Sequence, residues 1–297
     1  MSHNPSCWLV PRPQTFAALT TSSDASGCVF VLEAREVRLS PKSLPETPLP
    51  RPHIANVPCK GTSVIRVTNK PWKLDGHERI RLGKMTHPVR GFLHGTAAVV
   101  SLIGAVLVTV FAVGGVGQRL SLLIFGLSLV GLYTVSAVYH SIPWQVVWKQ
   151  RMQRLDHTMI HVLVAGTFTP IAFIMLDGWL RWMTLAVQWG IVLFGAIHSF
   201  GRENPSPVVS ITLQTTQGWL ALMLLWPLAQ RLPWTALMLI GMGGVFYTVG
   251  MVVMVTGRPR LWPRVFSSHE VFHVLVVAGS SVHFAAVAGY MARYSIA

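Results

Sequence analysis

Charged residues, and acidic ones above all, are scarce in this sequence. Asp, Glu, Lys and Arg make up 11% of the 297 residues, whereas about a quarter of a typical soluble domain is charged. Residues 91–297 contain four acidic side chains, which are Asp156, Asp177, Glu203 and Glu270. Because a charge at the middle of a bilayer is costly, this scarcity indicates that lipid surrounds much of the chain.

Three other features are missing, and each absence excludes a class of protein. The cysteines, Cys7, Cys28 and Cys59, have no CxxC spacing, which argues against a zinc ribbon or a redox motif. The net charge is +14, but the basic residues lie in short loops and in the N-terminal segment without interleaved aromatics, so we expect no nucleic-acid partner. Residues 1–20 contain prolines and no continuous apolar core, so the first membrane helix is expected to serve as the targeting signal.

Hydrophobic residues, by contrast, make up 52% of the chain and gather in runs of membrane-spanning length. The sequence therefore predicts an all-α membrane protein, a bundle of seven transmembrane helices within residues 85–297. The predicted spans are 92–113, 119–140, 156–176, 179–199, 208–228, 234–256 and 270–290.

Residues 1–84 have no sustained period of 3.6 or 2, although residues 28–32 favour a short strand. We expect a largely disordered N-terminal extension. An alternative hypothesis is that translation begins at Met85, directly before the first span.

The distribution of Lys and Arg predicts the orientation of the bundle. Twelve basic residues flank one side and four flank the other, and the more basic side is normally cytoplasmic. The sequence therefore predicts a cytoplasmic N-terminus and a multi-pass protein of the cell (plasma) membrane. The residues of the more basic side are Lys73, Arg79, Arg81, Lys84, Arg90, Lys149, Arg151, Arg154, Arg202, Arg258, Arg260 and Arg264, and those of the other side are Arg119, Arg181, Arg231 and Arg293.

Polar residues inside the predicted spans cluster at the cytoplasmic ends of three helices. His269 and His273 are four residues apart, so their imidazoles share one helix face and can bind one metal ion. His140 ends the second span at the same depth and can supply a third ligand, a set typical of catalytic zinc. Asp156 is then placed to orient or deprotonate a water molecule, and Ser136 to donate a supporting hydrogen bond.

Several separated motifs, in order and over about residues 86–290, resemble the hemolysin III family. That family is the bacterial branch of the progestin and adipoQ receptor superfamily, and it is more remotely similar to the alkaline ceramidases. The matching motifs are Arg90-Gly-Phe-Leu-His94, Ser136-Ala-Val-Tyr-His140, Leu155-Asp156-His157, Ala165-Gly-Thr-Phe-Thr-Pro170, His269-Glu-Val-Phe-His273 and His283-Phe284.

The resemblance implies a zinc site with assigned residues. Zinc is expected on His140, His269 and His273, with Asp156 contacting the zinc-bound water and Ser136 at the matching serine position. Three histidines with a carboxylate also accept other divalent first-row ions, so the metal itself stays open at this point.

The remaining histidines are interpreted differently. His157 and His161 form a second pair four residues apart, but family members do not keep a histidine at the second position, so both are assigned to packing or to the interface. His283 lies ten residues beyond His273, about 15 Å along a helix, which is too far to share the ion. His94 is either an ordinary interfacial residue or a neighbour of the site.

Two of the acidic residues are expected to serve no metal. Glu270 is about 100° around the helix from its histidine neighbour, so it is predicted to face Arg264 or lipid headgroups. Asp177 is expected in a solvated loop at the outer edge, beside Arg181.

These features leave three functional hypotheses open, all with membrane lipid as the partner and no protein partner identifiable. The first is a zinc-dependent hydrolase of a lipid amide or ester, in which Asp156 carries the proton. The second is a membrane sensor or homeostasis factor with structural zinc, in which Asp156 is the fourth ligand. The third is a cytolysin, which rests on the family label, because a pore needs polar side chains along whole spans.

Overall fold

The computed structural model describes residues 17–18, 31–32, 85–259, 261–262 and 265–294. The chain divides into two compact units, Met1–Leu74 and Asp75–Ala297. In the first unit, β1 (Ala17–Ala18) and β2 (Val31–Leu32) pair antiparallel, with Ala17 opposite Leu32. β2 falls within the strand expected at residues 28–32. The expected disorder of residues 1–84 concerns positions that lie almost wholly outside the described residues.

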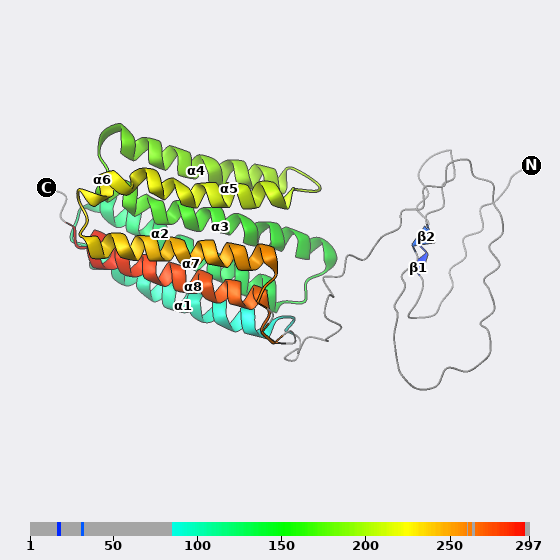
Figure 1. The fold of residues 1–297 in the computed structure, drawn as a ribbon. Helices are drawn as coiled ribbons and strands as arrows, with labels where there is room; N and C mark the ends of the chain where they lie inside the picture. The colour runs from blue at the N-terminus through cyan, green and yellow to red at the C-terminus, as the bar shows by residue number, and fades with distance from the viewer. Residues whose placement is uncertain (1–16, 19–30, 33–84, 260, 263–264, 295–297) are drawn as a thin grey trace, which may run out of the picture. The chain divides into compact units, whose positions relative to one another are not determined.

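In the described part of the second unit, seven helices are long and apolar enough to cross a membrane, which confirms the predicted fold class (Figure 1). One of the seven is an α-helix interrupted by a 3₁₀ turn, and the last ends in a π-helical segment. The elements are α1 (Pro88–Val110), α2 (Val116–Ser141), α3 (Val146–Met175), α4 (Gly178–Phe200), α5 (Pro207–Trp219), η1 (Leu220–Leu224), α6 (Leu225–Ala229), α7 (Trp234–Thr256), α8 (Ser268–Ala286) and η2 (Val287–Met291).

Local sequence signals explain where several of these helices begin and end. α1 begins with Pro88, whose fixed φ and missing N–H suit the first helical position. α8 begins with a capping box, in which Ser267 and Glu270 each bond the other's backbone N–H. α7 ends at Thr256 because Gly257 adopts a left-handed conformation with φ 66°.

Two boundaries differ from the predicted spans for identifiable reasons. α3 begins at Val146, ten residues before the predicted span at 156, because the intervening turns carry basic residues that a membrane-length window excludes but a helix accepts. The fifth span is predicted as one helix at 208–228 but changes to 3₁₀ geometry at Leu220–Leu224. Pro227 follows in α6, and its ring clashes with the carbonyl group four residues earlier, at Met223 inside η1.

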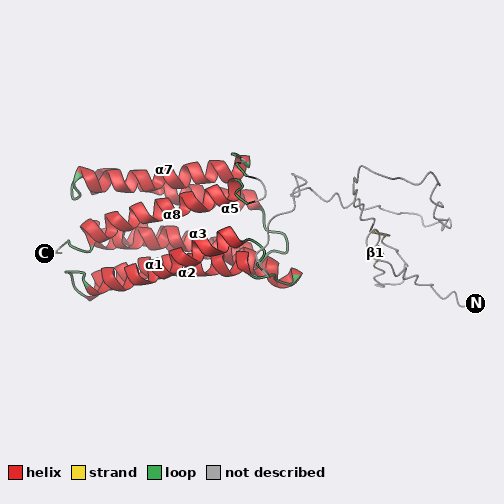
Figure 2. Cartoon of the chain, turned by 90° about the horizontal axis from the view of Figure 1, so that it is seen from below, coloured by secondary structure: helices red, strands yellow, loops and turns green. Residues whose placement is uncertain are grey.

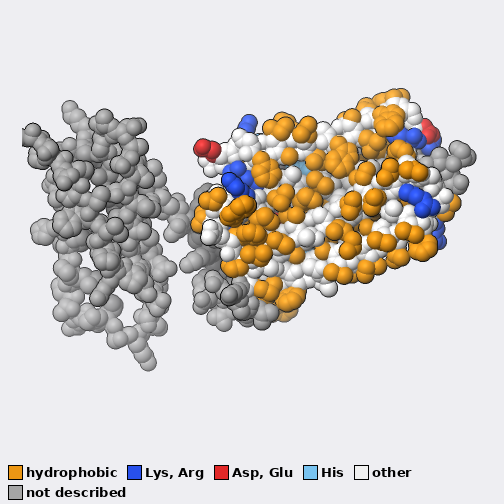
Figure 3. All heavy atoms as spheres, turned by 180° about the vertical axis from the view of Figure 1, so that it is seen from behind, with side chains coloured by type: hydrophobic (Ala, Val, Ile, Leu, Met, Phe, Trp, Pro, Cys, Tyr) orange, Lys and Arg blue, Asp and Glu red, His pale blue; other side chains and the backbone are white. Residues whose placement is uncertain are grey.

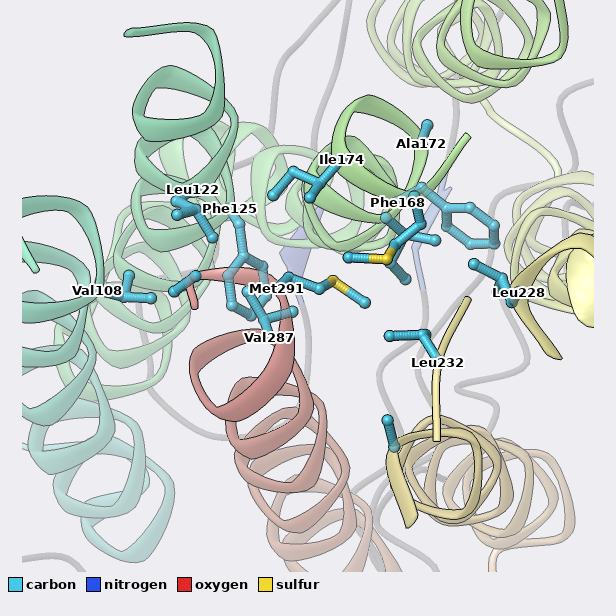
Figure 4. Packing of buried hydrophobic residues seen from close by; sticks show 14 of the residues in the cluster. Val108, Leu122, Phe125, Phe168, Ala172, Ile174, Leu228, Leu232, Val287 and Met291 are labelled. Carbon is cyan, nitrogen blue, oxygen red and sulfur yellow. The ribbon is translucent and has the colours of Figure 1, made fainter. Parts of the chain in front are cut away.

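α3 is the most buried of the membrane-length helices and lies at the centre of the bundle. It packs against α2, α4 and α5, while α1 packs against α2 and α8, and α8 packs against α7 (Figure 2). Buried residues from α1, α2, α3, α6, the loop before α7 and the C-terminal segment of the last span meet in one apolar core (Figure 4). Those labelled there are Val108, Leu122, Phe125, Phe168, Ala172, Ile174, Leu228, Leu232, Val287 and Met291.

Small residues let particular helix pairs approach closely. A Cβ atom added at Gly126 on α2 would lie 2.4 Å from the Cβ atom and 2.9 Å from the Cα atom of Ala105 on α1. A Cβ atom added at Gly243 on α7 would lie 2.2 Å from the ring of His283 on α8. Close backbone approach at small residues is typical of helix pairs in membranes, where dispersion replaces the hydrophobic effect as the main attraction.

The outer surface of the bundle is apolar along its length, and Lys and Arg side chains appear towards its ends (Figure 3). Large apolar side chains are exposed on the outer helices, including Val100, Leu193 and Val245. Tryptophans near helix ends are also exposed, as expected for an aromatic belt. They include Trp148, Trp179, Trp182, Trp226, Trp234 and Trp262.

Candidate metal centre

Four helix ends meet at one end of the bundle, which we call the site end: the starts of α1, α3 and α8 and the end of α2 (Figure 1). Backbone hydrogen bonds join the start of α1 to the end of α2, from His87 N to His140 O at 3.1 Å and from Thr86 N to Ser141 O at 3.2 Å. The turn before α1 is therefore tied to the last residues of α2. This brings residues that are far apart in the sequence to one depth.

Three histidines meet at the site end. Their possible ligand atoms, one from each of His140, His269 and His273, all lie within 4.8 Å of one another. The ring of His140 crosses the ring of His273 nearly at a right angle, with centroids 4.9 Å apart, and the rings of His269 and His273 are 4.7 Å apart. The structure thus brings together the three residues predicted as metal ligands, and this group can hold a metal ion.

The nitrogen atoms of this group fit a metal ion chemically. His140 and His273 are 4% and 3% exposed, and the Nε2 atom of each is buried with no hydrogen-bond partner among the described residues. A buried polar atom without a partner is costly, whereas a neutral imidazole nitrogen is a good ligand for zinc and other first-row divalent ions. A metal ion bound there would use both nitrogen atoms.

Asp156 and Ser136 lie beside this group and not within it. Both are buried, and the Asp156 carboxyl group is within hydrogen-bonding reach of the Ser136 side chain. Ser136 is one turn before His140 on α2, and Asp156 comes from α3. Among the described residues, the cluster within 4.8 Å contains the three histidines without Asp156. The two residues therefore lie outside the group that can hold a metal ion.

A fourth histidine, from α1, contacts the group. His94 is 2% exposed, and its Nε2 atom is 2.8 Å from the Nδ1 atom of His273. The two rings are nearly perpendicular, at 82°, with centroids 4.2 Å apart. The sequence placed His94 at the correct end of the first helix without deciding its role. Its position in the Arg90-to-His94 motif was the available signal, but the contact itself depends on how α1 and α8 pack.

Glu270 is buried, so the prediction that it faces lipid headgroups is wrong, while its other predicted neighbour, Arg264, lies outside the described residues. Glu270 Oε1 accepts a hydrogen bond from Arg90 Nε at 2.7 Å, and the two side chains are 4% and 7% exposed. The other carboxylate oxygen accepts hydrogen bonds from the backbone N–H and the hydroxyl group of Ser267. This buried ion pair joins α1 to α8 at the residue next to His269.

Replacing Arg90 with Met is expected to destabilise the fold by about 3–5 kcal/mol, because it takes the guanidinium group away from a buried carboxylate. The double change Arg90→Met/Glu270→Met is expected to recover most of that loss, because two apolar side chains replace the ion pair. Thermal melting of the purified protein in detergent measures both. If the double variant is no more stable than Arg90→Met, the loss of stability does not come from breaking the Arg90–Glu270 pair.

The other predicted histidine pair has separate partners. His161 is 1% exposed and donates from Nδ1 to Gln217 Oε1 at 2.9 Å, and Gln217 Nε2 donates back to the His161 carbonyl group at 3.1 Å. Gln188 Nε2 on α4 donates to the Gln217 carbonyl group at 3.2 Å. His157 is exposed, and its carbonyl group accepts from Gln214 Nε2. These bonds join α3, α4 and α5, in keeping with the packing role predicted for His161.

The polar residues towards the far end of the bundle are hydrogen-bonded to the backbone of neighbouring helices. His283 Nε2 is 3.0 Å from the Ile240 carbonyl oxygen on α7, so His283 is occupied away from the three-histidine group. Gln118 Nε2 donates to the carbonyl groups of Met291 and Tyr294, at 2.9 Å each. The sequence-based view that polar groups gather at one end was therefore incomplete, because buried polar side chains also tie helices together elsewhere.

Asp177 lies in the loop between α3 and α4 at the far end, as predicted. It binds Arg181 at 3.2 Å, and it also pairs with Arg231, from the loop before α7. The hydrogen bond from Arg231 lowers the pKa of Asp177. The pair therefore stabilises the fold at neutral pH and this contribution is lost in acid, but it is small because solvent screens exposed charges.

Comparisons with known proteins agree with this architecture. The family model described as Haemolysin-III related matches residues 83–284. The Hemolysin-3 homolog of Bacillus subtilis (strain 168) is 29% identical over 202 residues, which cover 67% of this chain and 92% of the relative. Hemolysin-3 of Bacillus cereus is 30% identical over 200 residues, which cover 67% of this chain and 88% of the relative.

A more distant relative is the human Monocyte to macrophage differentiation factor, 20% identical over 218 residues that cover 70% of this chain and 85% of the relative. The match to the family model covers more than half of the chain and spans the whole metal-centre region, from the start of α1 to the last turns of α8. The resemblance predicted from the motifs is confirmed. The chain belongs to the Haemolysin-III related family.

Proposed function

We propose that this membrane protein binds one zinc ion through His140, His269 and His273 and hydrolyses a lipid amide or ester at that site. The observation that carries the proposal is the convergence of three imidazoles, with ligand atoms within 4.8 Å of one another, while Asp156 contacts Ser136, one turn before His140 on α2. Three histidine ligands leave one position of a tetrahedral zinc ion for water or substrate, which is the arrangement of catalytic sites.

In the proposed hydrolysis, the metal ion and the side chains of this protein have different roles. A zinc ion held by three histidines supplies a Lewis acid that polarises a carbonyl group and acidifies water. Asp156 is placed to accept a proton and to return it to the leaving group. Ser136 holds the carboxyl group of Asp156 in position through the contact between their side chains. The buried Arg90–Glu270 pair holds the α8 histidines against α1.

The proposed substrate class follows from the depth and the orientation of the site. We take the site end to be cytoplasmic, because the sequence predicts twelve basic residues on that side of the membrane and four on the other. A centre at the helix ends lies near the lipid headgroups, where the amide and ester bonds of lipids meet water. Anionic headgroups of the plasma membrane would be attracted to the basic residues of this side.

The test is to remove the metal ion from the purified protein in lipid vesicles. Vesicles containing ceramides and phospholipids are incubated with the protein, and released fatty acid is measured by mass spectrometry. We expect release by the zinc-loaded protein, loss of release after treatment with a chelator, and recovery when zinc is added back. A matched sample of empty vesicles gives the background.

Other outcomes of the same test decide between the alternatives. Bound zinc without fatty-acid release, together with a large fall in melting temperature on chelation, would support structural zinc in a membrane sensor and contradict hydrolysis. Leakage of a dye from the vesicles would support the cytolysin hypothesis, which rests on the names of the Bacillus relatives. Absence of bound zinc in folded protein would overturn the metal site itself.

A further inference from the structure

His94 lies outside the three-histidine group, but it contacts the candidate ligand His273. The two rings touch through one nitrogen atom each, His94 Nε2 and His273 Nδ1, at 2.8 Å. The other nitrogen atom of His273, Nε2, is buried and has no hydrogen-bond partner among the described residues. His273 therefore has one nitrogen atom engaged by α1 and one available to a metal ion.

A neutral imidazole has a single proton, so this contact can form in two ways. In the first, His273 donates from Nδ1 to His94, which leaves the lone pair of His273 Nε2 for a metal ion. In the second, His94 donates from Nε2, which requires the proton of His273 to be on Nε2. The second arrangement blocks the metal ligand. The direction of one hydrogen bond thus decides whether His273 can bind metal.

The surroundings of His94 fix its position. The Tyr133 ring on α2 meets the His94 ring edge to face at 5.1 Å, and the Tyr133 hydroxyl group is hydrogen-bonded to Ser280 on α8. His94 is therefore contacted by the Tyr133 ring on α2 and by His273 on α8. The remaining nitrogen atom of His94, Nδ1, has no hydrogen-bond partner in the described part of the chain. No neighbouring group among the described residues sets the tautomer of His94. The direction of the hydrogen bond is therefore decided by whether His273 Nε2 binds a metal ion.

From this geometry we propose that His94 is a positioning residue for the metal centre. It accepts the Nδ1–H of His273, orients that ring and directs its Nε2 lone pair at the metal ion. The inference rests on the zinc site proposed above, and it gives α1 a part in a centre whose ligands come from α2 and α8. Groups that accept the second N–H of a metal-binding histidine typically raise metal affinity by about 10–100-fold.

The experiment compares two changes at His94 with a control next to it. His94→Leu removes the acceptor, whereas His94→Gln keeps an amide oxygen that can accept from His273. Tyr133→Phe is the matched control, because it keeps the ring that packs on His94 and removes a buried hydrogen bond elsewhere. Zinc affinity is measured by competition with a chelator, and the melting temperature of each metal-free protein is measured beside it.

We expect His94→Leu to weaken zinc binding by about 10–100-fold, with His94→Gln and Tyr133→Phe within a few-fold of the wild type. The visible spectrum of the cobalt(II)-loaded protein should change in His94→Leu, because a free His273 ring alters the coordination geometry. Wild-type affinity in His94→Leu would overturn the inference. An equal loss of zinc affinity in Tyr133→Phe would also overturn it, because the loss would then come from disturbed packing and not from the positioning of the His273 ring.

A second measurement needs no variant and keeps the inference testable if His94→Leu does not fold. Nitrogen-15 spectra of histidine-labelled wild-type protein with zinc report which ring nitrogen atoms carry protons. We expect a zinc-bound histidine with a protonated, hydrogen-bonded Nδ1 atom, and a protonated His273 Nε2 atom in the loaded protein would overturn the inference. Failure of the zinc site is distinguished at the start, because the wild type then binds no zinc in the competition assay.

Discussion

Replacing His269 and His273 together with Ala is expected to lower the zinc content of the purified protein from about one ion per chain to almost none. Both residues are on one face of α8, and their ligand atoms lie within 4.8 Å of each other and of a ligand atom of His140. A single remaining imidazole cannot hold zinc against a buffer, because each histidine contributes one of three bonds. Elemental analysis by mass spectrometry, with protein concentration from amino-acid analysis, measures the ratio.

His283→Ala is the matched control, because it removes a histidine from the same helix. His283 is bonded to the Ile240 carbonyl oxygen on α7 and belongs to no metal-binding group among the described residues. Its loss is expected to leave the zinc content at the wild-type value. Equal zinc in the double variant and the wild type would contradict the site, and an equal fall in both variants relative to the wild type would indicate damage to the bundle.

The meeting of His140, His269 and His273 could be predicted from the sequence because each inference was local or depended on topology alone. The spacing of His269 and His273 places both on one helix face. The alternation of spans and short loops then brings the end of α2 and the start of α8 to the same side of the membrane, which places His140 at their depth. No knowledge of side-chain packing was needed for these steps.

The contacts of His94, Arg90 and Glu270 could not be predicted in the same way. The 100° offset between successive residues of a helix correctly predicts that Glu270 points away from its histidine neighbour. It does not say which helix packs against the Glu270 face of α8. The answer, Arg90 at 2.7 Å, depends on the packing of α1 against α8. The contact between His94 and His273 depends on the same packing. The part of the site that comes from α1 is therefore the part that required the structure.

The 3₁₀ turn at Leu220–Leu224 is a second feature that the hydropathy of the fifth span concealed. A window of apolar residues measures length and composition, and both are normal for a membrane helix here. Pro227 was the available signal, because its ring disturbs the turn before it. Local backbone geometry inside a span thus follows from single residues and not from average composition.

Asp156→Asn is expected to lower the rate of lipid hydrolysis by about 10²–10⁴-fold, the usual contribution of a general acid–base group, while the zinc content stays unchanged. The amide is nearly the same shape as the carboxylate and can still accept a hydrogen bond from Ser136, but it cannot take up a proton at neutral pH. Because Asp156 lies outside the cluster of ligand atoms, the change should leave metal binding intact. The initial rate of fatty-acid release and the zinc content of the same sample are measured together.

Asp177→Asn serves as the control for this prediction, because Asp177 is an exposed aspartate in the loop at the far end of the bundle. Its rate should match the wild type. If Asp156→Asn loses its zinc, Asp156 is a fourth ligand and the site is closed, as in structural zinc centres. If it keeps both zinc and the wild-type rate, the proton must be carried by another group. The pair of measurements on one sample therefore separates a catalytic carboxylate from a metal ligand, the distinction on which the hydrolase and sensor hypotheses differ.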